Sequence, residues 1–193
     1  MKKEIIQQYF QVLGNCLANT ETTDREGRPI PLAQAVNSAV GKIRAMTDKS
    51  NKVMFVGNGG SAGISSHMAI DYLKNGGVPA MAFNDGASLT CLANDLGYDQ
   101  VFARQIAMHG RKGDLLIAIS SSGKSASILN AATVAREAGC EICTLSGFKP
   151  DNPLRAMGDF NFYVPSQEYG FVEIAHLTIC HAILDIKMDW LGG

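Results

Sequence analysis

Features that would mark a membrane, secreted or nucleic-acid-binding protein are scarce in this sequence. Its 17 basic and 18 acidic residues almost cancel, and they form no basic block or aromatic-interleaved stripe. This argues against nucleic acid as the main ligand. No apolar run approaches the length needed to cross a bilayer. Residues 1–10 include basic residues but turn amphipathic, unlike the apolar core of a signal peptide. We therefore expect a cytoplasmic protein.

Cysteine occurs in an odd number, and paired metal-binding motifs are missing. The five cysteines are scattered in apolar stretches, which predicts reduced thiols rather than a disulfide framework. Cys140 and Cys143 have the C-x-x-C spacing, but they lie in what reads as a short buried strand, and no second pair completes a zinc site. We favour core packing over redox chemistry, because a buried cysteine behaves as a small hydrophobe.

Internal repeats, linkers and low-complexity segments are also missing, so we expect residues 1–193 to form one domain. From residue 53 onward, short apolar strands alternate with helices. That pattern predicts an α/β fold, a three-layer sandwich with a mostly parallel, doubly wound sheet. Two amphipathic helices precede it in an integral segment, residues 1–50, and the first must cover the sheet or another subunit. We expect helices over 3–19, 31–47, 125–138 and 171–190, strands over 53–56, 80–83, 114–119, 141–145 and 160–164, and a loop over 19–31.

The chain is organised around residues 52–71, which run from a buried strand through a glycine-rich turn, Gly57–Gly63, into a helix. This arrangement presents unpaired backbone N–H groups and the positive end of a helix dipole to an anion. His67 and Asp71 follow in the helix and, four positions apart, project from one face. The combination indicates a phosphorylated small-molecule substrate.

Two other interpretations of the glycine-rich turn stay open. Gly57, Gly59 and Ala62 fit the G-x-G-x-x-G/A dinucleotide fingerprint, with Asp85 as a candidate ribose ligand. Alternatively, the glycines merely permit a tight turn. The dinucleotide interpretation is the weaker one, because it leaves a second polar loop, Ser120–Ser125, without a role.

This second loop offers four hydroxyls and successive backbone N–H groups at the start of a helix, which together suit a phosphate dianion. Its spacing does not fit a Walker A loop. A serine cluster can also serve turn formation and helix capping. We favour phosphate binding, because ligands of open parallel sheets bind beyond the carboxyl ends of the strands.

The C-terminal helix carries Glu173 and His181, with His176 on the other side of Glu173. Eight residues apart, Glu173 and His181 lie roughly 80° from each other around the helix. Together with His67 and Asp71 they supply two imidazoles and two carboxylates, which suit a divalent metal such as zinc. Whether the two pairs meet in space is a question for the structure.

An ordered set of motifs resembles a known family, the sugar isomerase (SIS) domain, and within it the sedoheptulose 7-phosphate isomerases. The resemblance covers nearly the whole chain. It rests on residues 56–62, His67-x-x-x-Asp71, residues 93–97 (Ala-Asn-Asp-x-Gly) and residues 119–125.

The resemblance implies a flavodoxin-like SIS fold and an aldose–ketose isomerase. Its reaction would convert sedoheptulose 7-phosphate to D-glycero-D-manno-heptose 7-phosphate, an early step of heptose biosynthesis for lipopolysaccharide, capsule or related glycans. It also implies a homotetramer with active sites between subunits. The substrate-binding residues implied are Asn58, Gly59, Gly60, Ser61, Asn94 and Asp95 for the sugar, and Ser120, Ser121, Ser122 and Ser125 for the phosphate.

The family's zinc ligands are His, Glu, Gln and His. By position, the resemblance places them on His67, Asp71, Glu173 and His181, so two of the four depart from the pattern. The Asp71 carboxylate would lie on the order of 1 Å further from a shared point than a glutamate carboxylate, which costs rate unless something compensates. Glu173 adds a carboxylate that either strengthens metal binding or takes over as base. We expect His181 and either Asp71 or Glu173 to exchange protons through an enediol.

Two competing functions follow from the same resemblance. One is isomerisation of another phosphosugar, which an altered carboxylate pair could accompany. The other is a regulatory SIS protein, such as a tetrameric replication-initiation factor that binds a partner protein and has lost the acid/base residues. The presence of His67 and His181 argues against the regulatory interpretation.

Overall fold

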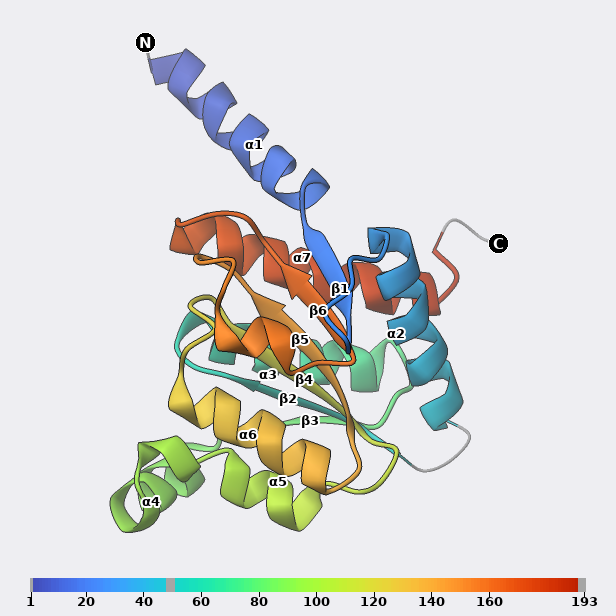
Figure 1. Cartoon of the computed structure of the whole chain (residues 1–193), viewed down its shortest axis with the longest axis vertical. Helices are drawn as coiled ribbons and strands as arrows, with labels where there is room; N and C mark the ends of the chain where they lie inside the picture. The colour runs from blue at the N-terminus through green and yellow to red at the C-terminus, as the bar shows by residue number, and fades with distance from the viewer. Residues whose placement is uncertain (1, 48–50, 191–193) are drawn as a thin grey trace.

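The computed structural model describes residues 2–47 and 51–190, which form a six-stranded sheet between helices (Figure 1). The strands are β1 (Glu21–Asp24), β2 (Val53–Gly57), β3 (Ala80–Ala82), β4 (Leu115–Ser120), β5 (Glu141–Ser146) and β6 (Phe160–Tyr163). The helices are α1 (Lys2–Ala18), α2 (Leu32–Thr47), α3 (Gly60–Lys74), α4 (Gly86–Leu96), α5 (Ala103–His109), α6 (Ala126–Glu137) and α7 (Tyr169–Lys187), with short 3-10 turns η1 (Tyr98–Gln100) and η2 (Pro153–Ala156). The predicted α/β fold is confirmed.

The strand order is β1-β6-β5-β4-β2-β3, and β2 to β6 form a parallel core. The chain steps from β2 outward to β3, and then continues on the other side of β2 with β4. The order therefore reverses between β2 and β4, and a crevice forms beyond the carboxyl ends of strands at such a point. Both polar loops of the sequence analysis follow these two strands.

The expectation of a loop over residues 19–31 is wrong at one point, because β1 lies within it. β1 pairs antiparallel with β6 at the edge of the sheet, and Thr22 lies opposite Phe162. The strand is four residues long with the polar sequence Glu-Thr-Thr-Asp. The sequence of this strand has no alternation of apolar residues from which it could be predicted. It is a strand because it forms hydrogen bonds with a partner that is distant in the chain.

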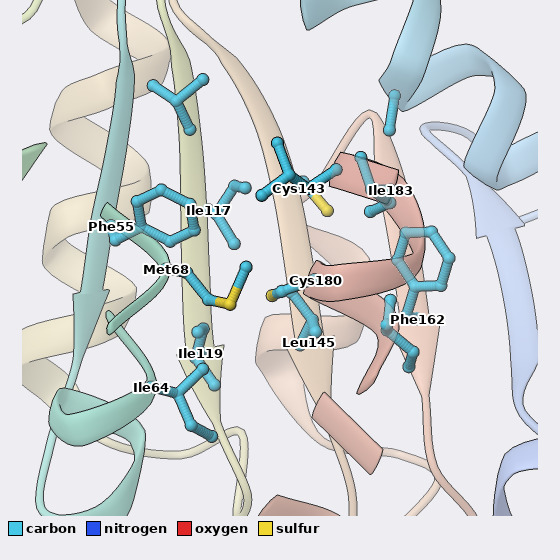
Figure 2. Packing of buried hydrophobic residues seen from close by; sticks show 14 of the residues in the cluster. Phe55, Ile64, Met68, Ile117, Ile119, Cys143, Leu145, Phe162, Cys180 and Ile183 are labelled. Carbon is cyan, nitrogen blue, oxygen red and sulfur yellow. The ribbon is translucent and has the colours of Figure 1, made fainter. Parts of the chain in front are cut away.

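Apolar side chains fill both faces of the sheet, as the continuous apolar strands predict. Along β2, Phe55 joins the cluster beneath α2, α3 and α7, whereas Met54 and Val56 join the cluster beneath α5 and α6. Figure 2 shows the first cluster, in which Phe55 and Met68 lie beside Ile117 of β4.

The cysteines behave mainly as core residues. Cys140 and Cys143 are buried and unpaired, so the preference for core packing over a redox pair is confirmed. Burial raises the pKa of both thiols. Cys180 points into the cluster of Figure 2, where burial raises its pKa to about 12. Cys91, in contrast, is exposed on α4.

The expectation that no apolar run approaches the length of a membrane span is wrong for helix α7. By length and composition alone, its 19 residues could cross a membrane. One face of the helix packs in the core, where Val172, Ala175, Ile179 and Ile183 are buried, whereas Ile174 and Ile186 are exposed. The apolar composition of α7 thus serves core packing on one face of the helix.

Helix α1 projects from the body of the protein (Figure 1). It confirms the predicted amphipathic helix, but much of its apolar face is uncovered: Ile5, Ile6, Tyr9 and Phe10 are exposed. At one point it contacts α7, where the rings of Tyr9 and Phe171 lie 4.7 Å apart. The remaining apolar surface is available to another chain.

Candidate active site

The two polar loops line one cavity of about 250 Å³ at the carboxyl ends of β2 and β4. It lies where the strand order reverses, the position expected of a ligand site in an open parallel sheet. Ten of the lining residues share an origin in the two loops or α7: Asn58, Gly59, Gly60, Ser61, Ser120, Ser121, Ser122, Ser125, Tyr169 and Glu173.

The serine loop leads from β4 into the start of α6. Ser125 is the N-cap of α6, and its hydroxyl makes no capping hydrogen bond. The Ser121 hydroxyl is buried and has no hydrogen-bond partner among the described residues. An unsatisfied buried hydroxyl costs about 1–3 kcal/mol, and an oxyanion in the cavity would remove that cost. The loop therefore combines a helix N-terminus with an unpartnered donor.

The glycine-rich loop presents a second helix N-terminus to the cavity. Gly59 is the N-cap of α3, with φ 55 and no side-chain cap. Beside it, the Asn58 amide is held from two sides. Its Nδ2 donates to Ser127 Oγ at 3.0 Å, and its Oδ1 accepts from the Tyr98 hydroxyl at 2.8 Å.

The geometry does not favour a dinucleotide. Asp85, the candidate ribose ligand, is the N-cap of α4 and accepts from the Ser88 backbone N–H at 2.8 Å. It does not line the cavity between the two loops. Asp85 therefore has a structural role that accounts for its presence.

Glu173 projects from α7 into the cavity, so that its carboxylate lies directly against Gly60. A Cβ on Gly60 would overlap that carboxylate, which explains why glycine occupies the first position of α3. Among the lining residues, Glu173 carries the carboxylate. It is therefore the acid best placed to meet a bound substrate.

His67, Asp71 and His181 gather in a second group, between α3 and α7. The two Nε2 atoms lie 3.3 Å apart, and His67 Nε2 lies 3.5 Å from Asp71 Oδ2. One ligand atom from each residue falls within 4.8 Å of the others. Two imidazole nitrogens and a carboxylate oxygen are ligands that zinc accepts, so these three residues fit a metal ion. The structure does not bring Glu173 into this group.

Asn94 and Asp95 lie elsewhere. Both are exposed on α4, where Asn94 Nδ2 donates to Asp95 Oδ1 at 2.8 Å. Neither residue lines the cavity. Their role in holding the sugar stays a prediction.

His176 proves to be a core residue. It is fully buried, and its Nε2 lies 3.1 Å from the Ser146 carbonyl oxygen, to which it donates as the neutral ring. Burial lowers its pKa to about 4, although the hydrogen bond to Ser146 partly opposes that shift. A histidine held neutral in this way packs α7 against β5.

Sequence reasoning missed Tyr169 and Tyr98 near the cavity. Tyr169 lines the cavity at the first position of α7, and Tyr98 reaches Asn58 from η1. Neither stands in a polar motif, so no signal marked them. A third missed residue, Asn152, precedes Pro153 at the start of η2. An asparagine before a proline is a recognised helix-start signature and could have been found.

Comparisons with known proteins agree with this geometry. A family model described as the SIS domain matches residues 8–147. The phosphoheptose isomerase of Rhodospirillum rubrum is 37% identical over 165 residues, which is 82% of this chain and 87% of the relative. That of Aliarcobacter butzleri is 35% identical over 194 residues, 96% of each protein.

A solved structure extends the similarity to three dimensions. The phosphoheptose isomerase from Neisseria gonorrhoeae matches with a TM-score of 0.83 at 26% identity, over 98% of this chain and 100% of that one. The residues matched by the family model include both loops of the cavity. The chain therefore belongs to the SIS-domain family and, within it, to the phosphoheptose isomerases.

Proposed function

We propose that this protein is an aldose–ketose isomerase that converts sedoheptulose 7-phosphate to D-glycero-D-manno-heptose 7-phosphate, an early step of heptose biosynthesis. One observation carries the proposal: the buried, unpartnered hydroxyl of Ser121 lies in a loop that, with the N-termini of α3 and α6, lines a single cavity. Such a cavity suits a phosphate group. The names of the relatives, phosphoheptose isomerase, support a heptose phosphate as the substrate.

The phosphate binds at Ser120, Ser121, Ser122 and Ser125, and the sugar extends along Asn58, Gly59, Gly60 and Ser61. Because the phosphate is on C7 and the reaction occurs at C1 and C2, the reacting carbons lie at the end of the sugar furthest from the serine loop. Asn58 is well suited to orient a sugar hydroxyl, because Ser127 and Tyr98 already fix its amide.

The reaction moves one proton between neighbouring carbons. A base removes a proton from C1 of the ketose, and the C1–C2 enediol forms as the carbonyl oxygen on C2 gains a proton. Return of a proton to C2, with loss of the proton from the C1 hydroxyl, yields the aldose. Glu173 is the base that the geometry favours, because it lines the cavity whereas Asp71 does not. His181 and Asp71 remain candidates for moving the proton between the two oxygens.

His67, Asp71 and His181 are the residues that would hold a divalent metal, which we propose to be zinc. When bound, such an ion stabilises negative charge on a nearby oxygen. Glu173 would join as a fourth ligand only through a different side-chain conformation, since its carboxylate lies against Gly60.

The experiment that tests the proposed activity is an isomerisation assay with sedoheptulose 7-phosphate, run with chelator and with added zinc. Appearance of the aldose heptose 7-phosphate, in proportion to protein concentration, is the expected result. A panel of other ketose and aldose phosphates serves as the control for substrate identity. Faster turnover of another phosphosugar would assign a different substrate, and no turnover of any would contradict an isomerase.

We also propose a cytoplasmic homotetramer with active sites between subunits. The uncovered apolar residues of α1 support association, and Ile70, Leu73 and Ile174 add exposed apolar surface on α3 and α7. Unpaired cysteines support a reducing compartment. Light scattering after gel filtration should give four times the chain mass of 20.6 kDa. A monomer at micromolar concentration would contradict this assembly.

A further inference from the structure

The side chain of Asn152 packs against Gly123 of the serine loop. It is only 2% exposed and does not line the cavity. We propose that Asn152 is a positioning residue that holds the phosphate-binding conformation of Ser120–Ser125. The inference rests on the proposed phosphate role of that loop.

The Asn152 amide joins the end of β5 to the turn η2. Its Nδ2 donates to the backbone oxygen of Lys149 at 2.8 Å, and lies 3.2 Å from Ser146 Oγ and 3.3 Å from the Gly147 oxygen. Its Oδ1 accepts from the Arg155 N–H at 3.1 Å. One buried amide thus ties together two segments that flank the serine loop.

Each of those segments is bonded to the backbone of the serine loop. The Gly147 N–H donates to the Ser121 oxygen at 3.0 Å, and the Leu154 N–H donates to the Gly123 oxygen at 3.1 Å. Gly123 has φ 62 and packs directly on Asn152, whose side chain a Cβ on Gly123 would overlap. The loop is therefore held at two carbonyls by the segments that the Asn152 amide joins, and at Gly123 by a close contact with Asn152 itself.

These contacts control the atoms that would meet phosphate. With Gly123 held in this conformation, its N–H bonds back to Ser120, at 3.0 Å from the backbone oxygen and 3.2 Å from Oγ. The same turn buries the unpartnered hydroxyl of Ser121. Hydrogen bonds weaken steeply when the donor angle falls below about 120°, so a loosened loop with misdirected donors would bind phosphate less well.

The chain offers a matched control in Asn161. It is 1% exposed, and its amide is equally engaged, accepting from Thr144 Oγ1 at 2.7 Å and from the Gly158 N–H at 2.9 Å. Its Nδ2 donates to Asp24 and Gly158 rather than to segments bonded to the serine loop. Asn152→Ala and Asn161→Ala therefore remove similar buried networks at different places.

The test measures the dissociation constant of inorganic phosphate by calorimetry, for the full chain and both variants. We expect Asn152→Ala to weaken phosphate binding roughly tenfold or more, as loss of supporting contacts around a ligand site does. The KM for sedoheptulose 7-phosphate should rise in parallel, while kcat changes by less than about twofold. Asn161→Ala should lower the melting temperature and leave the phosphate constant unchanged.

If Asn152→Ala does not fold, Asn152→Ser retains an acceptor that can cap η2 but loses the amide donors, and the same result is expected of it. Unchanged phosphate affinity in the folded variant, or equal weakening in Asn161→Ala, would overturn the inference. So would a wild-type protein that binds no phosphate. Phosphate binding without isomerisation would instead contradict the proposed reaction and support the serine loop as the anion site.

Discussion

The Nε2 atoms of His67 and His181 lie 3.3 Å apart, although the two residues are separated by 114 positions in the chain. Asp71 Oδ2 completes the group at 3.5 Å from His67. At this spacing, two neutral imidazoles can share one hydrogen bond, or both can turn their lone pairs to a cation. The three side chains are therefore close enough to bind one metal ion, which the sequence spacing alone could not show.

His67→Ala or His181→Ala should weaken zinc binding by about 100-fold or more, because each removes one of three gathered ligands. His109→Ala is the matched control, since His109 is exposed on α5 and stands apart from the cluster. Zinc content after dialysis against a metal buffer measures the effect. Equal zinc content in all three variants would show that His67 and His181 do not bind the metal.

Glu173→Gln should lower kcat by about 10² to 10⁴-fold with little change in KM, because it removes the carboxylate that lines the cavity and preserves its shape. Glu168→Gln, at the N-cap of α7, controls for loss of a nearby exposed acid. Steady-state kinetics decide the outcome. Wild-type turnover by Glu173→Gln would transfer the base role to Asp71 or His181.

Gly60→Ala should reduce kcat/KM by about 100-fold, because the added methyl would displace the Glu173 carboxylate, and a shift of 1 Å is enough for such a loss. Gly63→Ala, also in α3, meets nothing within 4 Å. It should leave kinetics unchanged and stabilise the helix by up to about 1 kcal/mol. Similar kinetics in the two variants would refute the close approach of α7 to α3.

His176 should make the free energy of unfolding depend on pH between about 4 and 6.5. Burial lowers its folded-state pKa to about 4, from an ordinary value of 6.5. Between these two values the unfolded chain binds a proton at His176 and the folded protein does not. The free energy of unfolding is therefore highest above pH 6.5 and falls by about 3 kcal/mol as the pH drops toward 4.

Urea titrations of the wild type and of His176→Gln across this range measure the effect. Glutamine keeps an N–H donor for the Ser146 oxygen but does not titrate, so its stability should vary less with pH over this window. His109→Gln, at an exposed position, should retain the wild-type slope. Parallel pH dependence in all three proteins would show that His176 is not the group responsible.

Much of the fold follows from periodicity in the sequence. Strands such as β2 and β4 are short apolar runs between helical segments, and this pattern alone places their following loops at one edge of the sheet. Strand β1 could not be predicted in the same way. Its polar residues acquire strand structure by pairing with β6, which lies near the other end of the chain.

The candidate site was predictable in its parts and less so in its grouping. Spacing placed Glu173 and His181 on adjoining faces of one helix, but it could not show that one face meets Gly60 and the other meets His67. Those meetings depend on how α7 packs against α3. For the same reason, the Asn-Pro signature could predict Asn152 as the cap of η2 but not its support of the serine loop, which arises from contacts between distant loops.

In the function proposed above, the cavity between the serine loop and Glu173 isomerises a heptose phosphate through an enediol. The most direct measurement is NMR of sedoheptulose 7-phosphate incubated with the protein in deuterated water. We predict formation of the aldose heptose 7-phosphate with deuterium at C2. The Glu173→Gln variant should not form this product at a comparable rate. A ketose that stays unchanged at high protein concentration with zinc supplied would show that this cavity does not isomerise sedoheptulose 7-phosphate.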